Sequence, residues 1–299
     1  MKKIGNTGSF KNFVLNNQIY VDKTEYIYNL LNNEARVFIS RPRRFGKSLT
    51  LDTIATLFET GVEPYFKDTW IYDKWTEPTY PVFRLSFLNL DNSSLDLFKK
   101  QLNSIISEFA NKISVKGYVE KTEPEDSILC LLEKLEEENR QIVILIDEYD
   151  YQLTSNINND DLYKEFQKKI KRFYANIKDK FAIKFLGITG VTRLKDVEIF
   201  SIGSDINDIT NDSVYSQMIG FTRDEIKKYY IDYLKLASSY ENNGSEDDVT
   251  DDMLESMLDM MAQNYDGYCF DEFYKKKVFS TWSVNKFFQN IVKNKFVDF

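Results

Sequence analysis

The sequence contains no histidine, and this absence excludes several kinds of chemistry at once. Nucleophilic systems that pair Ser or Cys with His, zinc sites built on imidazole and histidine-dependent nucleases all need that side chain. Cysteine is nearly absent as well, with Cys130 and Cys269 as its two examples. Two thiols are too few for a disulfide scaffold or a four-thiolate site, and they are typical of a reducing compartment. The sequence therefore predicts a cytoplasmic protein whose general base is a carboxylate.

Long hydrophobic runs and low-complexity stretches are missing too. No apolar segment approaches the ~20 residues of a membrane-spanning helix, and Lys2 and Lys3 precede no hydrophobic stretch. Five prolines and eleven glycines in 299 residues argue against a disordered or fibrous chain, and 42% hydrophobic residues are enough for a sizeable core. The net charge of −8 argues against a generally cationic surface for nucleic acid. We expect a soluble globular protein without a membrane partner.

Three local patterns are better explained by structure than by function. The basic stripe at residues 168–172 is, on a helix, more often a solvated face than a nucleic-acid surface. The sequence Glu-Ile-Lys at residues 225–227 resembles half of a metal nuclease motif, but it begins an amphipathic helix and does not follow a strand. The aromatic residues within 265–270 are interpreted as packing, with base stacking as the alternative.

Short apolar or β-branched runs alternate with longer helical patterns along the first 220 residues. We expect strands at residues 36–40, 82–87, 142–146 and 181–188, with 217–221 as a further candidate. Helices are expected at residues 24–32, 48–60, 95–112, 126–138 and 160–177. Repeated alternation of strand and helix predicts an α/β fold with a parallel sheet covered by helices.

The pattern becomes helical after Phe221. Helices are expected at residues 223–238, 252–263 and 283–293, and the acidic segment 239–252 is expected to be an exposed loop. The sequence thus predicts a core domain at residues 1–220 and a small α-helical lid domain at residues 221–299.

The segment from Ser40 to Leu49 follows a candidate strand and begins a candidate helix, which is the setting of a phosphate-binding loop. Backbone N–H groups would surround the phosphates, Lys47 would neutralise their charge, and the Ser48 hydroxyl would ligate Mg²⁺. The predicted nucleotide-binding residues are Arg43, Arg44, Phe45, Gly46, Lys47, Ser48 and Leu49.

This loop departs from the usual pattern G-x-x-x-x-G-K-[ST] at its first position, where Arg41 replaces glycine. The loop must therefore turn at that position without the conformational freedom of glycine. A degenerate match leaves open a chance Gly-Lys-Ser at the start of a helix, so the interpretation needs support from elsewhere in the chain.

Support comes from an apolar strand that ends in two adjacent acids, Asp147 and Glu148. Acids at the carboxyl end of a parallel strand face the crevice where ligands bind. Asp147 would hold Mg²⁺ together with Ser48, and Glu148 would orient and deprotonate the water that attacks the γ-phosphate. The alternative is a buried strand followed by a loop with a capping Asp.

The strand that follows ends in Thr189 and Gly190. We assign Thr189 to the γ-phosphate as a third catalytic residue beside Lys47 and Glu148, although Thr before Gly is also ordinary in a turn after a strand. Arg193 either reaches the same crevice or lies exposed, and the sequence leaves both readings open.

Taken in order, these motifs resemble those of the bacterial AAA-ATPase-like family, whose members often carry a C-terminal nuclease-like domain of the PD-(D/E)XK type. The matching segments read YVDKT, RPRRFGKSL, LIDEYD, TGVT, NDIT, GFT and YDGY at residues 20–24, 41–49, 145–150, 189–192, 207–210, 220–222 and 265–268. The family pattern itself carries arginine at the position of Arg41.

The resemblance implies a P-loop core in which the Thr189 strand lies between the Gly46 strand and the Asp147 strand, with a helical lid and ATP as the nucleotide. Residues 151–152 and 280–281 depart from the family pattern, away from the phosphates. Family members usually continue beyond the point where this chain stops at Phe299, so the resemblance implies a truncated lid and no nuclease active site here.

The function predicted first is Mg²⁺-dependent ATP hydrolysis that drives rearrangement of the lid or of a partner, with a link to nucleic-acid processing or defence left open. An arginine from a second copy of the chain or from a protein partner would complete the site. The candidates are Arg43, Arg44, Arg172 and Arg193. The alternatives are a nucleotide-gated binding module with little or no turnover, and a scaffold with a vestigial loop that binds no nucleotide.

Overall fold

The computed structural model describes residues 1–5, 7–192 and 205–297. In these residues, five parallel strands form a sheet in the order β2-β3-β4-β1-β5. The strands are β1 (Arg36–Ser40), β2 (Val82–Ser86), β3 (Ile142–Asp147), β4 (Ile183–Gly190) and β5 (Asn207–Asp208). β4 lies between β1 and β3, as the family resemblance implied. The predicted α/β fold with a parallel sheet is confirmed.

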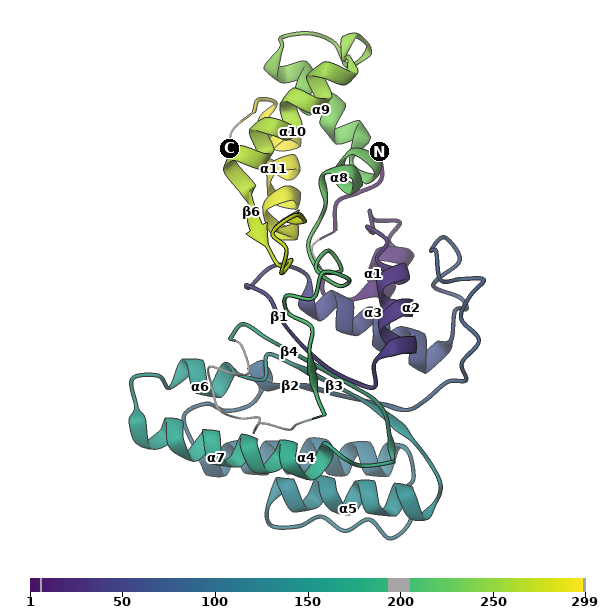
Figure 1. The fold of residues 1–299 in the computed structure, drawn as a ribbon, viewed down its shortest axis with the longest axis vertical. Coiled ribbons are helices and arrows are strands. Elements are labelled where there is room, and N and C mark those ends of the chain that lie inside the picture. Colours follow the sequence, from purple (N-terminus) through teal and green to yellow (C-terminus); the bar gives the residue numbers. More distant parts are fainter. Residues whose placement is uncertain (6, 193–204, 298–299) are drawn as a thin grey trace.

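Helices cover both faces of this sheet (Figure 1). One face packs against α4 (Leu95–Lys112), α5 (Pro124–Glu137), α6 (Tyr151–Ser155) and α7 (Asp160–Ile177). The other packs against α1 (Phe10–Leu15), α2 (Thr24–Asn33) and α3 (Lys47–Thr60). Successive side chains of a strand point to opposite faces, so Phe38 joins the first core while Val37 and Ile39 join the second. Each such fully buried side chain contributes roughly 1.5–3 kcal/mol.

The chain after Phe221 forms a third, largely helical core that includes part of the N-terminal segment. Its elements are α8 (Arg223–Tyr229), α9 (Ile231–Glu241), α10 (Asp251–Tyr265), β6 (Asp266–Cys269), β7 (Lys277–Phe279) and α11 (Thr281–Asn294). Ile19 and Val21 are buried among these helices, and the Tyr233 hydroxyl donates to the carbonyl of Lys2 at 2.9 Å. The N-terminal segment therefore contacts both the sheet domain and the helical part.

Several expectations about individual elements need correction. Residues 217–221 are not a strand, because the chain turns there through Gly220 at a φ of +104° and Phe221 forms only an isolated bridge with Phe279. The fifth strand is the short polar segment Asn207–Asp208 instead. The helical part is not purely α-helical, because β6 and β7 form an antiparallel hairpin. The predicted exposed loop at residues 239–252 is shorter than expected, because α9 continues to Glu241, α10 begins at Asp251 and Ser239 is buried. Residues 241–248 are exposed and include the short 3-10 helix η3 (Glu246–Asp248).

The described part of the chain has no helix whose length and apolar character would let it cross a bilayer.

Candidate functional site

The predicted phosphate loop connects β1 to α3, at the carboxyl edge of the sheet. Gly46 precedes the first residue of α3 and has a φ of +106°, in the left-handed region where a residue with a Cβ is strained. Arg44 also lies in this region, with a φ of +69°. The first amides of α3 have no carbonyl partner within the helix and carry its positive dipole end. Such a helix start suits an anion.

Arg41 explains how the loop turns without its first glycine. Its side chain is fully buried, and the guanidinium donates to the carbonyls of Ser40 at 2.8 Å and Thr210 at 2.7 Å. The same group lies 4.0 Å from the centre of the Phe270 ring. Arg41 is not among the residues with positive φ, so this position needs no glycine. It anchors the loop to the segment after β5 and to the hairpin.

Asp147, at the end of β3, is bonded to two other predicted site residues, which come from two further elements. The Ser48 hydroxyl on α3 donates to one carboxylate oxygen of Asp147 at 2.5 Å. The Thr189 hydroxyl on β4 donates to the other oxygen at 2.5 Å. Neighbouring parallel strands end at the same edge of the sheet, which is why β3, β4 and the start of α3 can meet there.

Lys47 and Glu148 complete this cluster. The Lys47 ammonium lies 3.9 Å from the Glu148 carboxylate and donates to the loop carbonyls of Arg41 at 3.0 Å and Pro42 at 3.2 Å. Burial lowers the pKa of Lys47, and the nearby acids partly oppose this effect. Burial also raises the pKa of Glu148, with Asp147 and Asp150 adding to the rise and Lys47 opposing it. The site therefore holds a carboxylate with a raised affinity for a proton beside a buried cation.

The backbone of Glu148 is in a conformation that non-glycine residues seldom adopt, with a φ of +54°. This left-handed turn directly after β3 sends the chain away from the sheet. Such local strain costs of order 1–3 kcal/mol and persists where surrounding contacts hold it, often at functional sites.

The contacts that hold this turn come from two residues whose roles the sequence analysis did not assign. The Tyr149 N–H donates to the carbonyl of Thr189 at 3.1 Å. Asp150 is 1% exposed and accepts the N–H of Thr192 at 2.7 Å. A side chain on Gly190 would come within 2.4 Å of the Tyr149 ring, so the glycine allows this close approach. The sequence analysis paired Asp147 with Ser48, but it did not predict the contact of Asp150 with the backbone of Thr192.

The helical part touches the phosphate loop through the start of α11. The carbonyl of Arg44 accepts the Thr281 hydroxyl at 3.0 Å and the Trp282 N–H at 3.3 Å. The Arg44 guanidinium lies 4.3 Å from the centre of the Trp282 ring. These contacts link the loop directly to the helical part, and no local pattern in the sequence predicted them.

A cavity of about 260 Å³ lies beside the phosphate loop. The loop, the N-terminal segment and the helical part all contribute residues to its lining. The loop and the start of α3 contribute residues from Arg44 to Thr50, and the helical part contributes Thr281, Trp282 and Asn285. Leu49, the last of the predicted nucleotide-binding residues, also lines it. At its wall, Asn285 donates to the carbonyl of Gly5 at 3.1 Å.

Among the candidate arginines, Arg43 is exposed on the loop, and its charge lowers the pKa of both Lys47 and Glu148. Arg44 is engaged with Trp282. Arg193 lies outside the described residues.

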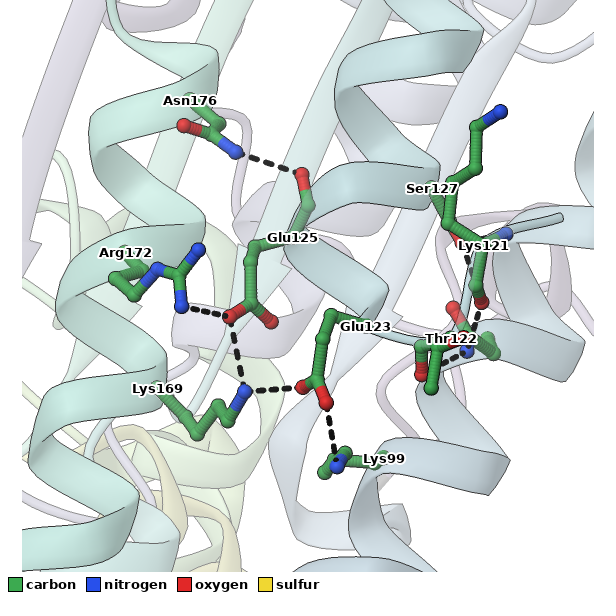
Figure 2. A network of polar contacts seen from close by, with 10 residues as sticks. Lys99, Lys121, Thr122, Glu123, Glu125, Ser127, Lys169, Arg172 and Asn176 are labelled. Carbon is green, nitrogen blue, oxygen red and sulfur yellow. Dashed lines mark hydrogen bonds and ion pairs between the residues drawn. The ribbon is translucent and has the colours of Figure 1, made fainter.

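Arg172 belongs to an ion network on the helices that cover the sheet (Figure 2). It lies 3.4 Å from the buried carboxylate of Glu125, which Lys169 also contacts at 3.0 Å. Lys169 pairs with Glu123 as well, and Lys99 reaches Glu123 at 2.8 Å. The basic stripe is therefore split between exposed lysines at 168 and 171 and residues that tie α4, α5 and α7 together.

This fold and this loop define the class of the protein. A parallel sheet with a phosphate loop after β1, and an acid after a strand separated from β1 by β4, is the arrangement of a P-loop nucleotide-binding protein. A family model described as "Predicted AAA-ATPase" matches residues 4–200, and the chain belongs to this family. Its parallel sheet and its phosphate-binding loop agree with membership of this family.

A curated relative from Azotobacter chroococcum mcd 1, described as an uncharacterized protein in the vnfD 5' region, is 31% identical over 235 residues. The match covers 72% of this chain and 45% of the relative, so the chain spans about half the relative's length. The crystal structure of Cdc6p from Pyrobaculum aerophilum aligns with a TM-score of 0.33 and 16% identity, over 71% of this chain and 47% of that one.

Proposed function

We propose that this protein binds ATP with Mg²⁺ and hydrolyses its γ-phosphate, and that nucleotide state sets the position of the lid. One observation carries the proposal: Ser48, Asp147 and Thr189 are joined by hydrogen bonds at the N-terminus of α3. A helix start, a metal-binding hydroxyl and a strand-end carboxylate at one point are the parts that phosphoryl transfer needs.

Lys47 is proposed to bind the β- and γ-phosphates. Its ammonium donates to two carbonyls of its own loop, and phosphate oxygens would replace these acceptors. The amides of residues 43–49 would surround the same phosphates. The buried position of Lys47 supports this role, because a charge in a site with little water interacts more strongly with an anion.

The donor set at Asp147 fits Mg²⁺. Ser48 and Asp147 would hold the ion together with phosphate oxygens, since Mg²⁺ is usually bound by one or two carboxylates plus substrate phosphates. Within the described residues, no group of three or more His, Cys, Asp or Glu side chains could hold a metal ion. The ion would neutralise phosphate charge when bound.

Glu148 is proposed to orient the attacking water and accept its proton. A base works best when its pKa lies near the working pH, and burial moves the pKa of Glu148 upward toward that range. Thr189 is proposed to sense whether the γ-phosphate is present, because its hydroxyl donates to the same Asp147 carboxylate as the Ser48 hydroxyl does. We propose that Arg43 assists phosphate binding in its own chain, because it is exposed on the loop and its charge acts on Glu148 of the same chain.

The cavity of about 260 Å³ is proposed to receive the nucleoside. It begins at the loop and is walled on its far side by the lid, so its occupant would contact both. The Thr281 and Trp282 contacts with Arg44 would then transmit a change at the loop to α11. We propose that this takes place in the cytoplasm, in keeping with two free cysteines.

Calorimetric titration with Mg²⁺ and a non-hydrolysable ATP analogue tests binding, and phosphate release tests turnover. Saturable binding together with phosphate release supports the ATPase. Binding without release, even at high protein concentration, would replace it with a nucleotide-gated switch. Absence of binding would overturn both.

A further inference from the structure

We propose that the tip of the β6–β7 hairpin binds a single-stranded polynucleotide. The tip consists of residues 272–277, which follow Asp271 and read EFYKKK. Figure 1 shows the hairpin extending from the lid helices toward the sheet. The proposal does not depend on ATP hydrolysis, because it concerns side chains outside the phosphate loop.

The tip exposes two adjacent aromatic side chains. Phe273 is 62% exposed and Tyr274 is 83% exposed. An aromatic side chain buries roughly 150–250 Å² when it packs, and this surface remains largely in water here. Adjacent exposed aromatic rings at the end of a projecting hairpin are typical of a binding surface, unlike the scattered single apolar residues found on any protein.

The tip is held in one conformation before any partner arrives. Asp271 is 3% exposed, and its carboxylate accepts the N–H groups of Phe273 at 3.2 Å, Lys275 at 2.9 Å and Lys276 at 3.0 Å. The Lys276 ammonium donates to the carbonyl of Ser213 at 2.8 Å. Binding therefore costs little ordering of the backbone.

The base of the hairpin is anchored to the phosphate loop by aromatic packing. The ring of Phe45 lies edge-on to Tyr268 at 4.7 Å and to Phe270 at 5.7 Å between centroids. Phe270 also carries the Arg41 guanidinium. Tyr265 and Phe270 are thus partly buried, as the packing interpretation predicted, whereas Tyr268 contacts Phe45 but is 42% exposed. Phe273 and Tyr274, a few residues further on, are exposed.

The charge of the tip complements a polyanion, in contrast to the net acidic protein. Three exposed lysines stand against one exposed acid, Glu272, and the buried carboxylate of Asp271, so residues 271–277 keep an excess of positive charge. Among the ion pairs of the described residues, none involves Lys275 or Lys277. Asp212 lies in the neighbouring loop and accepts the N–H of Val214 at 2.7 Å.

Flat rings beside ammonium groups match the alternation of bases and phosphates in a single strand. A duplex keeps its base faces stacked inside and cannot offer them to Phe273 and Tyr274. A membrane surface fits less well, because interfacial binding typically uses the broad apolar face of an amphipathic helix, whereas this tip is a short turn between two strands.

The test is fluorescence anisotropy with labelled oligo(dT) and oligo(rU) of about 20 nucleotides, without ATP, at about 50 to 200 mM salt. We expect Phe273→Ala and Tyr274→Ala each to weaken binding by about fivefold or more, because each removes one stacking partner. The double variant Lys275→Ala, Lys277→Ala should reduce the slope of log binding constant against log salt concentration by about 1.4 in magnitude. This is the change expected when two phosphate contacts to a single strand are lost. Comparison of the two oligonucleotides identifies DNA or RNA as the source.

Matched controls are Phe181→Ala and Lys168→Ala, which alter an exposed aromatic ring and an exposed lysine on the sheet domain. Their binding should equal that of the parent. The proposal is overturned if the parent binds neither oligonucleotide at low salt, or if the tip variants bind as tightly as the parent. Tip-dependent binding to vesicles containing phosphatidylserine, without oligonucleotide binding, would overturn it in favour of a membrane. Calorimetry with the ATP analogue on the same variants measures nucleotide binding independently. A failure of the polynucleotide proposal can therefore be distinguished from a failure of the proposed ATPase.

Discussion

The ammonium group of Lys47 lies 3.9 Å from the carboxylate of Glu148, at the point where the start of α3 meets the end of β3. Burial disfavours both charges, and each charge stabilises the other. An incoming γ-phosphate would compete with Glu148 for Lys47, so this pair connects phosphate binding to the state of the proposed base.

Lys47→Ala should abolish nucleotide binding. The variant removes a charged donor to the phosphates, and two charge-assisted hydrogen bonds at roughly 1.5 kcal/mol or more each correspond to a loss of about 100-fold. Calorimetric titration with Mg²⁺ and a non-hydrolysable ATP analogue measures the change. Lys168→Ala, on the exposed face of α7, is the control. Parent-like affinity in Lys47→Ala would contradict the assignment of the loop.

Glu148→Gln should bind ATP and turn it over poorly. The amide keeps the shape of the side chain but cannot accept the proton of the attacking water, and loss of a general base costs on the order of 10²–10⁴ in rate. Steady-state phosphate release and calorimetry on the same preparation separate turnover from binding. Glu165→Gln, at an exposed position of α7, should behave as the parent does. Unchanged turnover in Glu148→Gln would remove Glu148 from the mechanism.

As the pH is lowered, the rate of hydrolysis should begin to fall at a higher pH than it would if the base were a Glu with the usual pKa. Glu148 acts as a base only when it is deprotonated, and burial raises its pKa above the usual value of about 4.3. The acid limb of a pH profile of kcat/KM reports this group. An acid limb at or below the ordinary Glu value would show that another group limits the rate.

The same shift predicts a pH-dependent effect on stability. Because the folded-state pKa of Glu148 is raised above its unfolded value, the charged carboxylate destabilises the folded protein, fully so above the folded pKa. This cost disappears as the pH falls through the folded pKa to the unfolded one. Glu148→Gln should therefore raise Tm at about pH 7 and leave it nearly unchanged at about pH 4. Thermal denaturation followed by circular dichroism checks both, and a stabilisation that is larger in acid would contradict the sign.

Thr189→Val should reduce turnover by roughly tenfold while nucleotide affinity changes little. The substitution conserves shape and removes the hydroxyl that donates to Asp147, a charged hydrogen bond worth roughly 1.5–3 kcal/mol. Thr60→Val, at the other end of α3, is the control because its hydroxyl bonds within that helix. If both variants turn over like the parent, Thr189 has a structural role at the end of β4 and no role in turnover.

The ion pair formed by the buried Lys23 and the partly buried Glu225 should be important for stability. Their ammonium and carboxylate lie 2.6 Å apart and join the N-terminal segment to α8. Lys23→Met leaves the Glu225 carboxylate without its counter-charge, so we expect a loss of roughly 3–5 kcal/mol in the free energy of unfolding.

A double-mutant cycle with Glu225→Gln gives the control for this prediction. The double variant has no unpaired buried charge and should recover part of the loss, which chemical denaturation measures. Lys227→Met breaks an exposed pair with Glu255 and should change stability far less. Equal effects of Lys23→Met and Lys227→Met would show that the Lys23 pair is not buried in solution.

Local patterns in the sequence were enough to find the parts of the core and of the candidate site. Strands β1 and β3 are apolar runs whose residues are buried on both faces, and such runs are visible without a structure. Ser48, Asp147 and Glu148 each follow directly from their place at the end of a strand or the start of a helix. Because carboxyl ends of parallel strands meet at one edge, their convergence could also be expected.

Contacts between distant segments were decided only by the tertiary structure. Arg41 reads as a defect of the loop in the sequence, yet it is an anchor because Thr210 and Phe270 come to lie beside it. The contact of Arg44 with α11 was equally unpredictable. A residue's neighbours in sequence set its conformational preference, whereas its neighbours in space depend on how every helix packs on the sheet. The residues of the candidate site could therefore be recognised in the sequence. Their contacts with the helical part and the hairpin could be seen only in the folded structure.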